Sequence, residues 1–206
     1  MRRTFVLLIF QLNLGFGLLF SQTTTVCITM ENNSSIIING STNIIPFRLS
    51  QTGDKLANKV YTVTASQVQN KIILNQNQYS IVVKNFNSMN KMALRDFMKL
   101  MKSDVYPEIK VQLNYIENQS GLDDYSKGQA SVNITLTGIT KHYIIPISAK
   151  RSSDFYNLIG KMRLTIKDFG ITPPTEMLGM IKVNEWIDID LNLFCKIIPV
   201  NVVKEN

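Results

Sequence analysis

The fold is decided by the stretch TLTGITKHYIIPI at residues 135–147, read together with KDFGI at residues 167–171. The first stretch predicts a strand, a turn centred on Gly138 and a returning strand. The second predicts a turn placed where the following strand ends. Neither stretch contains a nucleophile with a base, a metal cluster or a phosphate-binding loop. Their alternation of apolar and polar residues predicts a β-barrel with one apolar face, which indicates a container for an apolar molecule before it indicates an enzyme.

The same alternation extends through most of the chain. Apolar residues fall on one face in segments 108–115, 129–137, 161–167 and 186–195, with Tyr115 counted on the apolar face of the first. Further strands are expected near 35–39, 45–50, 59–65, 71–74, 79–86 and 142–149. One solvent-facing polar face and one apolar face are typical of an antiparallel sheet. Many strands with short turns predict a sandwich or a closed barrel. Closure to about eight strands would also remove the exposed sheet edges.

Residues 89–102 depart from the strand pattern and predict a short amphipathic helix. Apolar residues recur there at helical spacing, and Ser88 is the expected N-cap. A basic stripe lies opposite, formed by Lys91, Arg95, Lys99 and Lys102. This helix either plugs or flanks the barrel, or it acts as a lid whose methionines repack around ligands while its lysines attract an anionic head group or membrane.

The first residues predict export. Arg2 and Arg3 precede an apolar run from Phe5 to Phe20, which a polar segment follows. These are the parts of a secretory signal peptide, expected to cover residues 1–22. The alternative is a membrane anchor, but the apolar run is short and interrupted for a bilayer about 30 Å thick. The remaining residues, 23–206, are expected to form one domain that works in the periplasm or is secreted.

The two cysteines, Cys27 and Cys195, stand near the two ends of the exported part of the chain. First and last strands are neighbours in a closed antiparallel barrel, so a disulfide between these residues is one expectation. The other is two free thiols, with Cys195 buried on the apolar face and Cys27 in a tail.

A search for reactive groups predicts no catalytic residues, no metal site and no cofactor. His142 is the single histidine and is expected on the surface or at a rim. Asp188 and Asp190 share a face of the last strand and are expected on its exterior. The formal charge of +7 is not gathered into basic clusters interleaved with aromatic residues, which argues against nucleic-acid binding. The chain is therefore predicted not to be an enzyme.

Several motifs occur in the order found in the YceI-like family, over about residues 35–196. They are Asn39-Gly40-Ser41-Thr42-Asn43 with Phe47, Asp96-Phe97 through Tyr106-Pro107-Glu108-Ile109, the hairpin at 136–141 with Ile145-Pro146-Ile147, Leu158-Ile159-Gly160-Lys161-Met162 leading to Asp168-Phe169-Gly170-Ile171, and Ile181-Lys182-Val183 before the last strand. The chain thus resembles this family. The resemblance implies a lipocalin-like antiparallel barrel, exported to the periplasm, that binds a polyisoprenoid or similar amphiphile in its interior.

Two functions are carried forward. The first is a non-enzymatic binding protein for a polyisoprenoid or other lipid-like amphiphile, with transient contact with an anionic membrane. The second is an exported structural or interaction barrel whose core is filled. The residues expected to bind the ligand are Ile81, Val83, Phe97, Leu100, Met101, Ile109, Val111, Leu113, Val132, Ile134, Leu136, Met162, Leu164 and Phe169.

Overall fold

The computed structural model describes residues 23–57, 59–75, 77–119, 125–152, 155–176 and 180–200. The expected signal peptide at 1–22 lies outside the described residues. The strands are β1 (Thr23–Met30), β2 (Ser35–Ser41), β3 (Pro46–Thr52), β4 (Val60–Val68), β5 (Lys71–Asn75), β6 (Gln78–Val82), β7 (Glu108–Asn118), β8 (Tyr125–Leu136), β9 (Ile139–Ser152), β10 (Phe155–Thr165), β11 (Thr175–Glu176), β12 (Ile181–Lys182) and β13 (Trp186–Pro199). The helices are α1 (Lys91–Leu100) and the 3-10 turns η1 (Gly53–Lys55), η2 (Val83–Asn85) and η3 (Ile166–Phe169).

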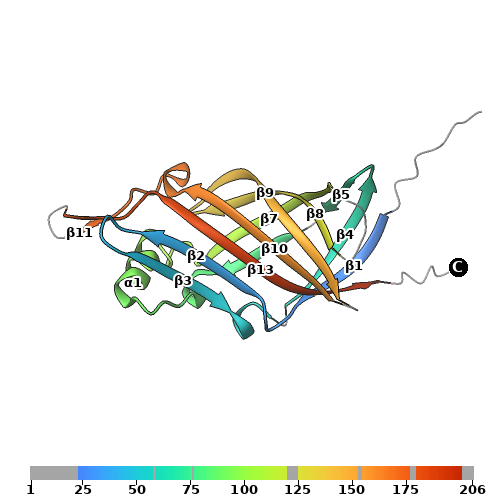
Figure 1. Ribbon diagram of the computed structural model, residues 1–206, viewed down its shortest axis with the longest axis horizontal. Coiled ribbons are helices and arrows are strands. Elements are labelled where there is room, and N and C mark those ends of the chain that lie inside the picture. Colours follow the sequence, from blue (N-terminus) through green and yellow to red (C-terminus); the bar gives the residue numbers. More distant parts are fainter. Residues whose placement is uncertain are drawn as a thin grey trace, which may run out of the picture.

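The strands form a closed antiparallel barrel, as the alternation predicts. The ring runs β1-β4-β5-β7-β8-β9-β10-β13 and closes where β13 pairs with β1 (Figure 1). Along one edge β13 pairs with β10. Along the other it pairs first with β2, through residues 188–192, and then with β1, through residues 195–199. The long last strand thus joins the two ends of the sheet and leaves no open edge there.

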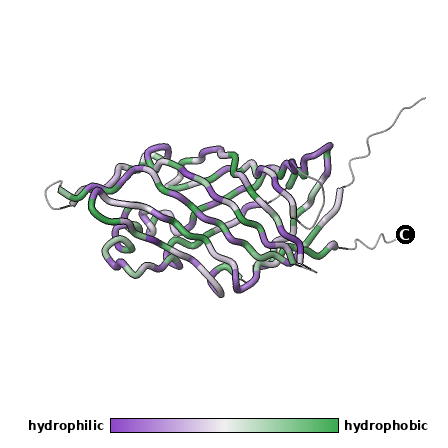
Figure 2. The backbone as a smooth tube through the Cα atoms, viewed as in Figure 1, coloured by the Kyte–Doolittle hydropathy of each residue, from purple (hydrophilic) through white to green (hydrophobic). Residues whose placement is uncertain are grey.

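Hydrophobic and hydrophilic residues alternate along the strands, as Figure 2 shows. This alternation sends one row of side chains inward and the next outward. One exception lies on β7, where the register shifts between Leu113 and Tyr115. The extra residue of this β-bulge turns Tyr115 to the outside, where Lys71 lies over its ring, and turns Ile116 inward. The prediction that Tyr115 shares the apolar face was therefore wrong.

The helix α1 lies at the end of the barrel away from the start of β1 (Figure 1). It spans Lys91–Leu100 within the predicted 89–102, and its N-cap is Asn90, whose side chain accepts a hydrogen bond from Ala93 N–H at 3.0 Å. The predicted cap, Ser88, instead donates its hydroxyl to the backbone carbonyl of Arg48 on β3 at 2.6 Å. Among the described residues, no helix is both long and apolar enough to cross a bilayer.

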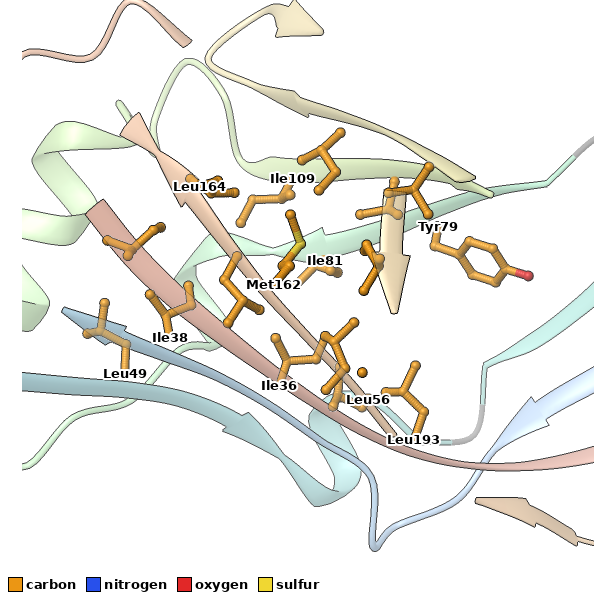
Figure 3. A pocket seen from close by; sticks show the side chains of 18 of the residues that line it. Ile36, Ile38, Leu49, Leu56, Tyr79, Ile81, Ile109, Met162, Leu164 and Leu193 are labelled. Carbon is orange, nitrogen blue, oxygen red and sulfur yellow. The ribbon is translucent and has the colours of Figure 1, made fainter. Parts of the chain in front are cut away.

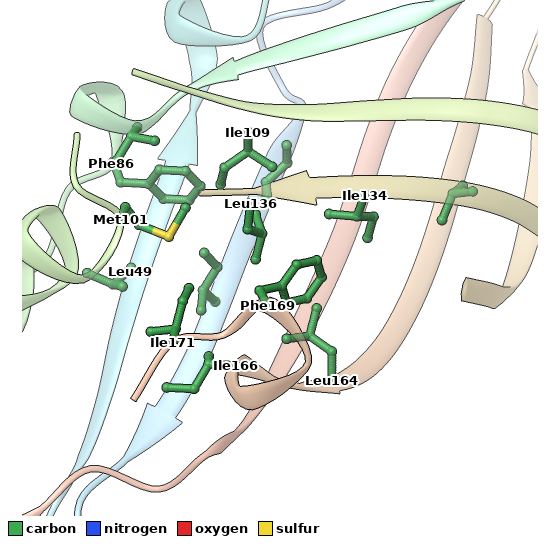
Figure 4. Close-up of a cluster of buried hydrophobic side chains, with 14 of the residues drawn as sticks. Leu49, Phe86, Met101, Ile109, Ile134, Leu136, Leu164, Ile166, Phe169 and Ile171 are labelled. Carbon is green, nitrogen blue, oxygen red and sulfur yellow. The ribbon is translucent and has the colours of Figure 1, made fainter. Parts of the chain in front are cut away.

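A packed hydrophobic cluster fills the barrel near α1 (Figure 4). Phe169 and Leu49 are each 1% exposed there, and Met101 is 5% exposed. Phe169 reaches this position from the turn η3, which ends at Gly170 with a left-handed φ of 66° that glycine adopts without strain. The KDFGI turn thus carries a core residue rather than a reactive one.

Candidate functional site

The barrel encloses a cavity of about 770 Å³ with an almost wholly apolar wall (Figure 3). Its lining extends from Met92 and Pro174 near α1 to Ile72 and Ile197 at the end where β1 starts and β13 ends. A volume of this size lies in the range of small-molecule and cofactor sites, about 300–1,000 Å³. The interior is therefore not completely filled by the protein's own side chains.

Most of the residues that the sequence predicts to bind a ligand line this cavity. They are Ile81, Phe97, Leu100, Met101, Ile109, Val111, Leu113, Val132, Ile134, Leu136, Met162 and Leu164. Val83 and Phe169 are placed elsewhere. Val83 is 0% exposed in η2 and Phe169 is packed in the core cluster, where its ring stacks on Tyr143 at 6.2 Å between centroids. These two residues are packed in the core cluster and are not part of the cavity wall.

The cavity wall also contains residues that the sequence-based prediction of the site missed. Val26, Ile28 and Met30 come from β1, Ile36 and Ile38 from β2, and a row from Ile187 to Ile197 comes from β13. Alternation marks the β13 row, and it also marks β1. However, the threonines at 23–25 also fit the polar segment that follows the apolar run of a signal peptide. For this reason the first strand was not predicted.

One end of the cavity is bounded by α1. Ala93, Phe97 and Leu100 on its inner face line the cavity, and the Phe97 ring meets the Phe86 ring edge to face at 5.3 Å. Met101 just beyond the helix is buried in the core cluster, whereas Met92 at the start is 53% exposed. The C-terminal end of the helix is thus packed into the core, whereas its N-terminal end is partly exposed to solvent.

The two cysteines are free and lie on opposite faces of the sheet. Cys195 is inward-facing, buried, and paired in register with Met30. Cys27 alternates to the outer face between Val26 and Ile28, with its sulfur 3.8 Å from Thr62 Oγ1. The strands are neighbours as expected, but sulfurs on opposite faces of a sheet cannot bond. This geometry corrects the predicted Cys27–Cys195 disulfide, and burial raises the pKa of Cys195 to about 11.

One group of polar residues interrupts the apolar wall. Lys59, Tyr61 and Tyr79 all line the cavity, and the two phenol rings lie 4.6 Å apart between centroids. Burial raises the pKa of Tyr79 to about 12. Burial, followed by the nearby Glu108 carboxylate, also raises the pKa of Tyr61. Both phenols thus remain neutral hydrogen-bond donors at any physiological pH.

The ionisable residues noted in the sequence lie on the outer face. Arg163 binds Asp188 through two hydrogen bonds of 2.7 and 2.8 Å, which lower the pKa of the Asp188 carboxyl, and Lys161 lies 3.4 Å from Asp190. His142 is exposed, and its Nε2 lies 2.8 Å from Ser131 Oγ. Within the part of the chain that the structure describes, no group of three or more metal-ligating side chains comes together.

The comparisons with known proteins agree with this geometry at the level of the fold. No family model matches the chain, and no curated protein matches its sequence. Solved structures do match. A polyisoprenoid binding domain from Saccharophagus degradans, implicated in plant cell wall breakdown, has a TM-score of 0.56 at 9% identity over 82% of this chain and 97% of that chain. BcnA from Burkholderia cenocepacia has a TM-score of 0.51 at 11% identity over 78% of this chain and 95% of that chain.

A YceI protein from Campylobacter jejuni also matches, with a TM-score of 0.42 at 13% identity over 64% of this chain and 72% of that chain. The fold and cavity define an all-β, lipocalin-like barrel with an apolar interior. The two structures with TM-scores above 0.5 confirm the lipocalin-like barrel fold that the resemblance to the YceI-like family implies.

Proposed function

We propose that this protein is an exported, non-enzymatic binding protein that holds one long apolar or amphiphilic molecule inside its barrel. The observation that carries the proposal is the apolar cavity of about 770 Å³ inside the barrel. A barrel built only as a structural module would gain stability by filling this space, because empty volume in a core costs packing energy. The cavity therefore favours a container over the filled-barrel alternative.

The length of the cavity supports a long-chain ligand. Ile187 and Ile197 both line it and stand ten positions apart on β13. At about 3.3 Å per residue this is about 33 Å of strand. A strand tilt of about 40° reduces it to about 25 Å along the barrel axis. We assign the ligand to the polyisoprenoids or similar lipids, a proposal that the polyisoprenoid binding domain of the same fold supports.

We extend the proposal to a transient contact with an anionic membrane at the α1 end. Ile44 and Ile45 in the β2–β3 turn are 64% and 51% exposed, and Met180 is 66% exposed. Asn43 ties the two segments together, because its side chain donates to the carbonyl of Met180 at 2.9 Å and accepts from Lys182 N–H at 2.8 Å. Ile44 and Ile45 also line the cavity, so a bilayer that received these side chains would lie at its mouth.

Lys182 lies beside this apolar surface, because its backbone N–H bonds to Asn43, and Lys91 lies on the same end of the barrel at the start of α1. Lys91 at the start of α1 and Lys182 on β12 are both solvent-exposed, and each adds attraction toward anionic lipid of about 1 kcal/mol. Export by removal of residues 1–22 would bring the barrel to the periplasm or outside the cell, where such a surface could exchange ligand with a membrane. The intact mass of protein isolated from its own cells tests this removal.

The function is tested by measuring affinity for a series of polyprenols of increasing length, by displacement of a neutral fluorescent probe from delipidated protein. Each added methylene that becomes buried contributes about 0.8 kcal/mol, or roughly fourfold in Kd. We expect the affinity to rise with chain length and to level off once the cavity is full. A protein that binds none of the series would contradict the proposed function.

A further inference from the structure

The barrel wall has a seam between β4 and β6. Residues 60–63 of β4 pair with β1 on one side, but β4 pairs with β5 only from residue 64 onward. The strand β6 pairs with β7 and with no other described strand. The two strands thus face each other without a ladder of backbone hydrogen bonds. Side chains bridge the seam instead.

Two contacts form this bridge. The Tyr61 and Tyr79 rings lie 4.6 Å apart with a 56° angle between their planes. Lys59 Nζ donates a hydrogen bond to the backbone carbonyl of Ser80 at 3.3 Å. The surrounding wall is apolar, with Ile28, Leu56 and Ile81 lining the cavity beside the seam. Figure 3 shows Tyr79 at this edge of the cavity.

The hydrogen-bond donors of this cluster are not used up within the described part of the protein. An ammonium group has three N–H donors, and the bond to Ser80 uses one of them. Lys59 forms no ion pair with a described carboxylate, and the hydroxyls of Tyr61 and Tyr79 have no hydrogen-bond partner among the described residues. All three residues line the cavity, so an acceptor oxygen on a bound ligand would find unused donors at this point of the wall.

We propose that Lys59, Tyr61 and Tyr79 form a head-group subsite that binds the anionic oxygens of an amphiphile, a carboxylate or a phosphate, while its chain occupies the apolar cavity. This inference rests on the proposed function and adds the polar half of the ligand. A cation gives the strongest hydrogen bonds to such oxygens, and two neutral phenols supply further donors without adding charge. Because the seam lies in the barrel wall, these donors occupy one side of the cavity. The rest of the cavity remains free for the apolar chain of the ligand.

The test compares three ligands that share one alkyl chain. Palmitate, hexadecyl phosphate and hexadecanol displace the neutral probe N-phenyl-1-naphthylamine from delipidated protein. We expect the wild-type protein to bind palmitate, hexadecyl phosphate or both at least about tenfold more tightly than hexadecanol. A tenfold difference in Kd is the effect expected from one charge-assisted hydrogen bond. Which anion is preferred distinguishes a fatty acid from a phosphate-bearing lipid.

The variants are Lys59→Met and the double variant Tyr61→Phe with Tyr79→Phe. Both should reduce the preference for the anions to about threefold or less and leave the affinity for hexadecanol nearly unchanged. The matched control is Lys110→Met, which removes the same charge from the exposed outer face opposite Ser80 and should keep the wild-type preference.

The outcomes separate the two proposals. If the wild-type protein binds hexadecanol and both anions equally, the subsite is refuted and the container function stands. The subsite is also refuted if Lys110→Met loses the preference as strongly as Lys59→Met. Failure of all three ligands to displace the probe would remove the proposed function and the subsite with it.

Discussion

Gly160 allows a direct test of the cavity, because it is an inward-facing position without a side chain. It lies on β10 between Ile147 of β9 and Leu191 of β13. A Cβ atom at this position would lie 3.4 Å from Ile147 Cγ2 and 3.5 Å from Leu191 Cδ1, which are ordinary van der Waals distances. Its φ is not among the positive values. A side chain introduced here therefore begins without backbone strain and extends into the cavity.

Gly160→Trp is expected to block the chain of the ligand. An indole that excludes about four methylenes removes about 3 kcal/mol of burial energy, which corresponds to a loss of affinity of about a hundredfold. Gly160→Ala is the matched control. It adds one methyl group, should change affinity by no more than about fourfold, and should stabilise the fold by up to about 1 kcal/mol by restricting the unfolded chain.

The assay combines probe displacement by a long polyprenol with urea unfolding of each variant. Overpacking would cost Gly160→Trp about 1–3 kcal/mol, so the measured unfolding free energy shows whether the variant is folded before its affinity is interpreted. A folded Gly160→Trp protein that binds the polyprenol as tightly as wild type would refute the placement of the ligand in this cavity.

Three further predictions follow from the packing. Met101→Ala should lower the free energy of unfolding by about 2–5 kcal/mol. Phe97→Ala should lower it less and should speed ligand release, measured by stopped-flow probe exchange. Equal release rates in Phe97→Ala and wild type would contradict this prediction. Titration of the unfolded, unreduced protein should find both thiols free, and in the native protein Cys27 should react much faster than Cys195, whose pKa is raised to about 11; a single slow phase for both would count against it. Gly128→Ala should destabilise the barrel by about 1–3 kcal/mol in urea unfolding, since the new Cβ would lie 2.3 Å from a backbone oxygen of β7; an unchanged midpoint would oppose this.

The period-two pattern predicts the barrel and most of the cavity wall, because alternate residues of a strand must face opposite sides. On this basis Ile109, Val132 and Leu164 are predicted on the apolar face, and all three line the cavity. The same pattern cannot distinguish an inward residue that lines a cavity from one that is packed among other core side chains. This is why Val83 and Phe169 were assigned to the ligand although both are buried in the core.

Other features depend on pairing between distant segments. The bulge before Tyr115 reverses the face of that residue, and no local signal in the alternating run indicates it. The seam that brings Lys59 beside Ser80 and Tyr61 beside Tyr79 arises because β7 changes partner from β6 to β5 along its length. The two cysteine side chains lie on opposite faces of the sheet because of the register between β1 and β13, and this register could not be read from the sequence.

The most direct test of the central claim is native mass spectrometry of the protein purified without detergent after export, combined with organic extraction of the same sample. We predict a complex of one protein chain with one lipid-like molecule, and a species of the matching mass in the extract. Protein that carries no ligand, and that takes none up after incubation with lipid vesicles, would contradict the account.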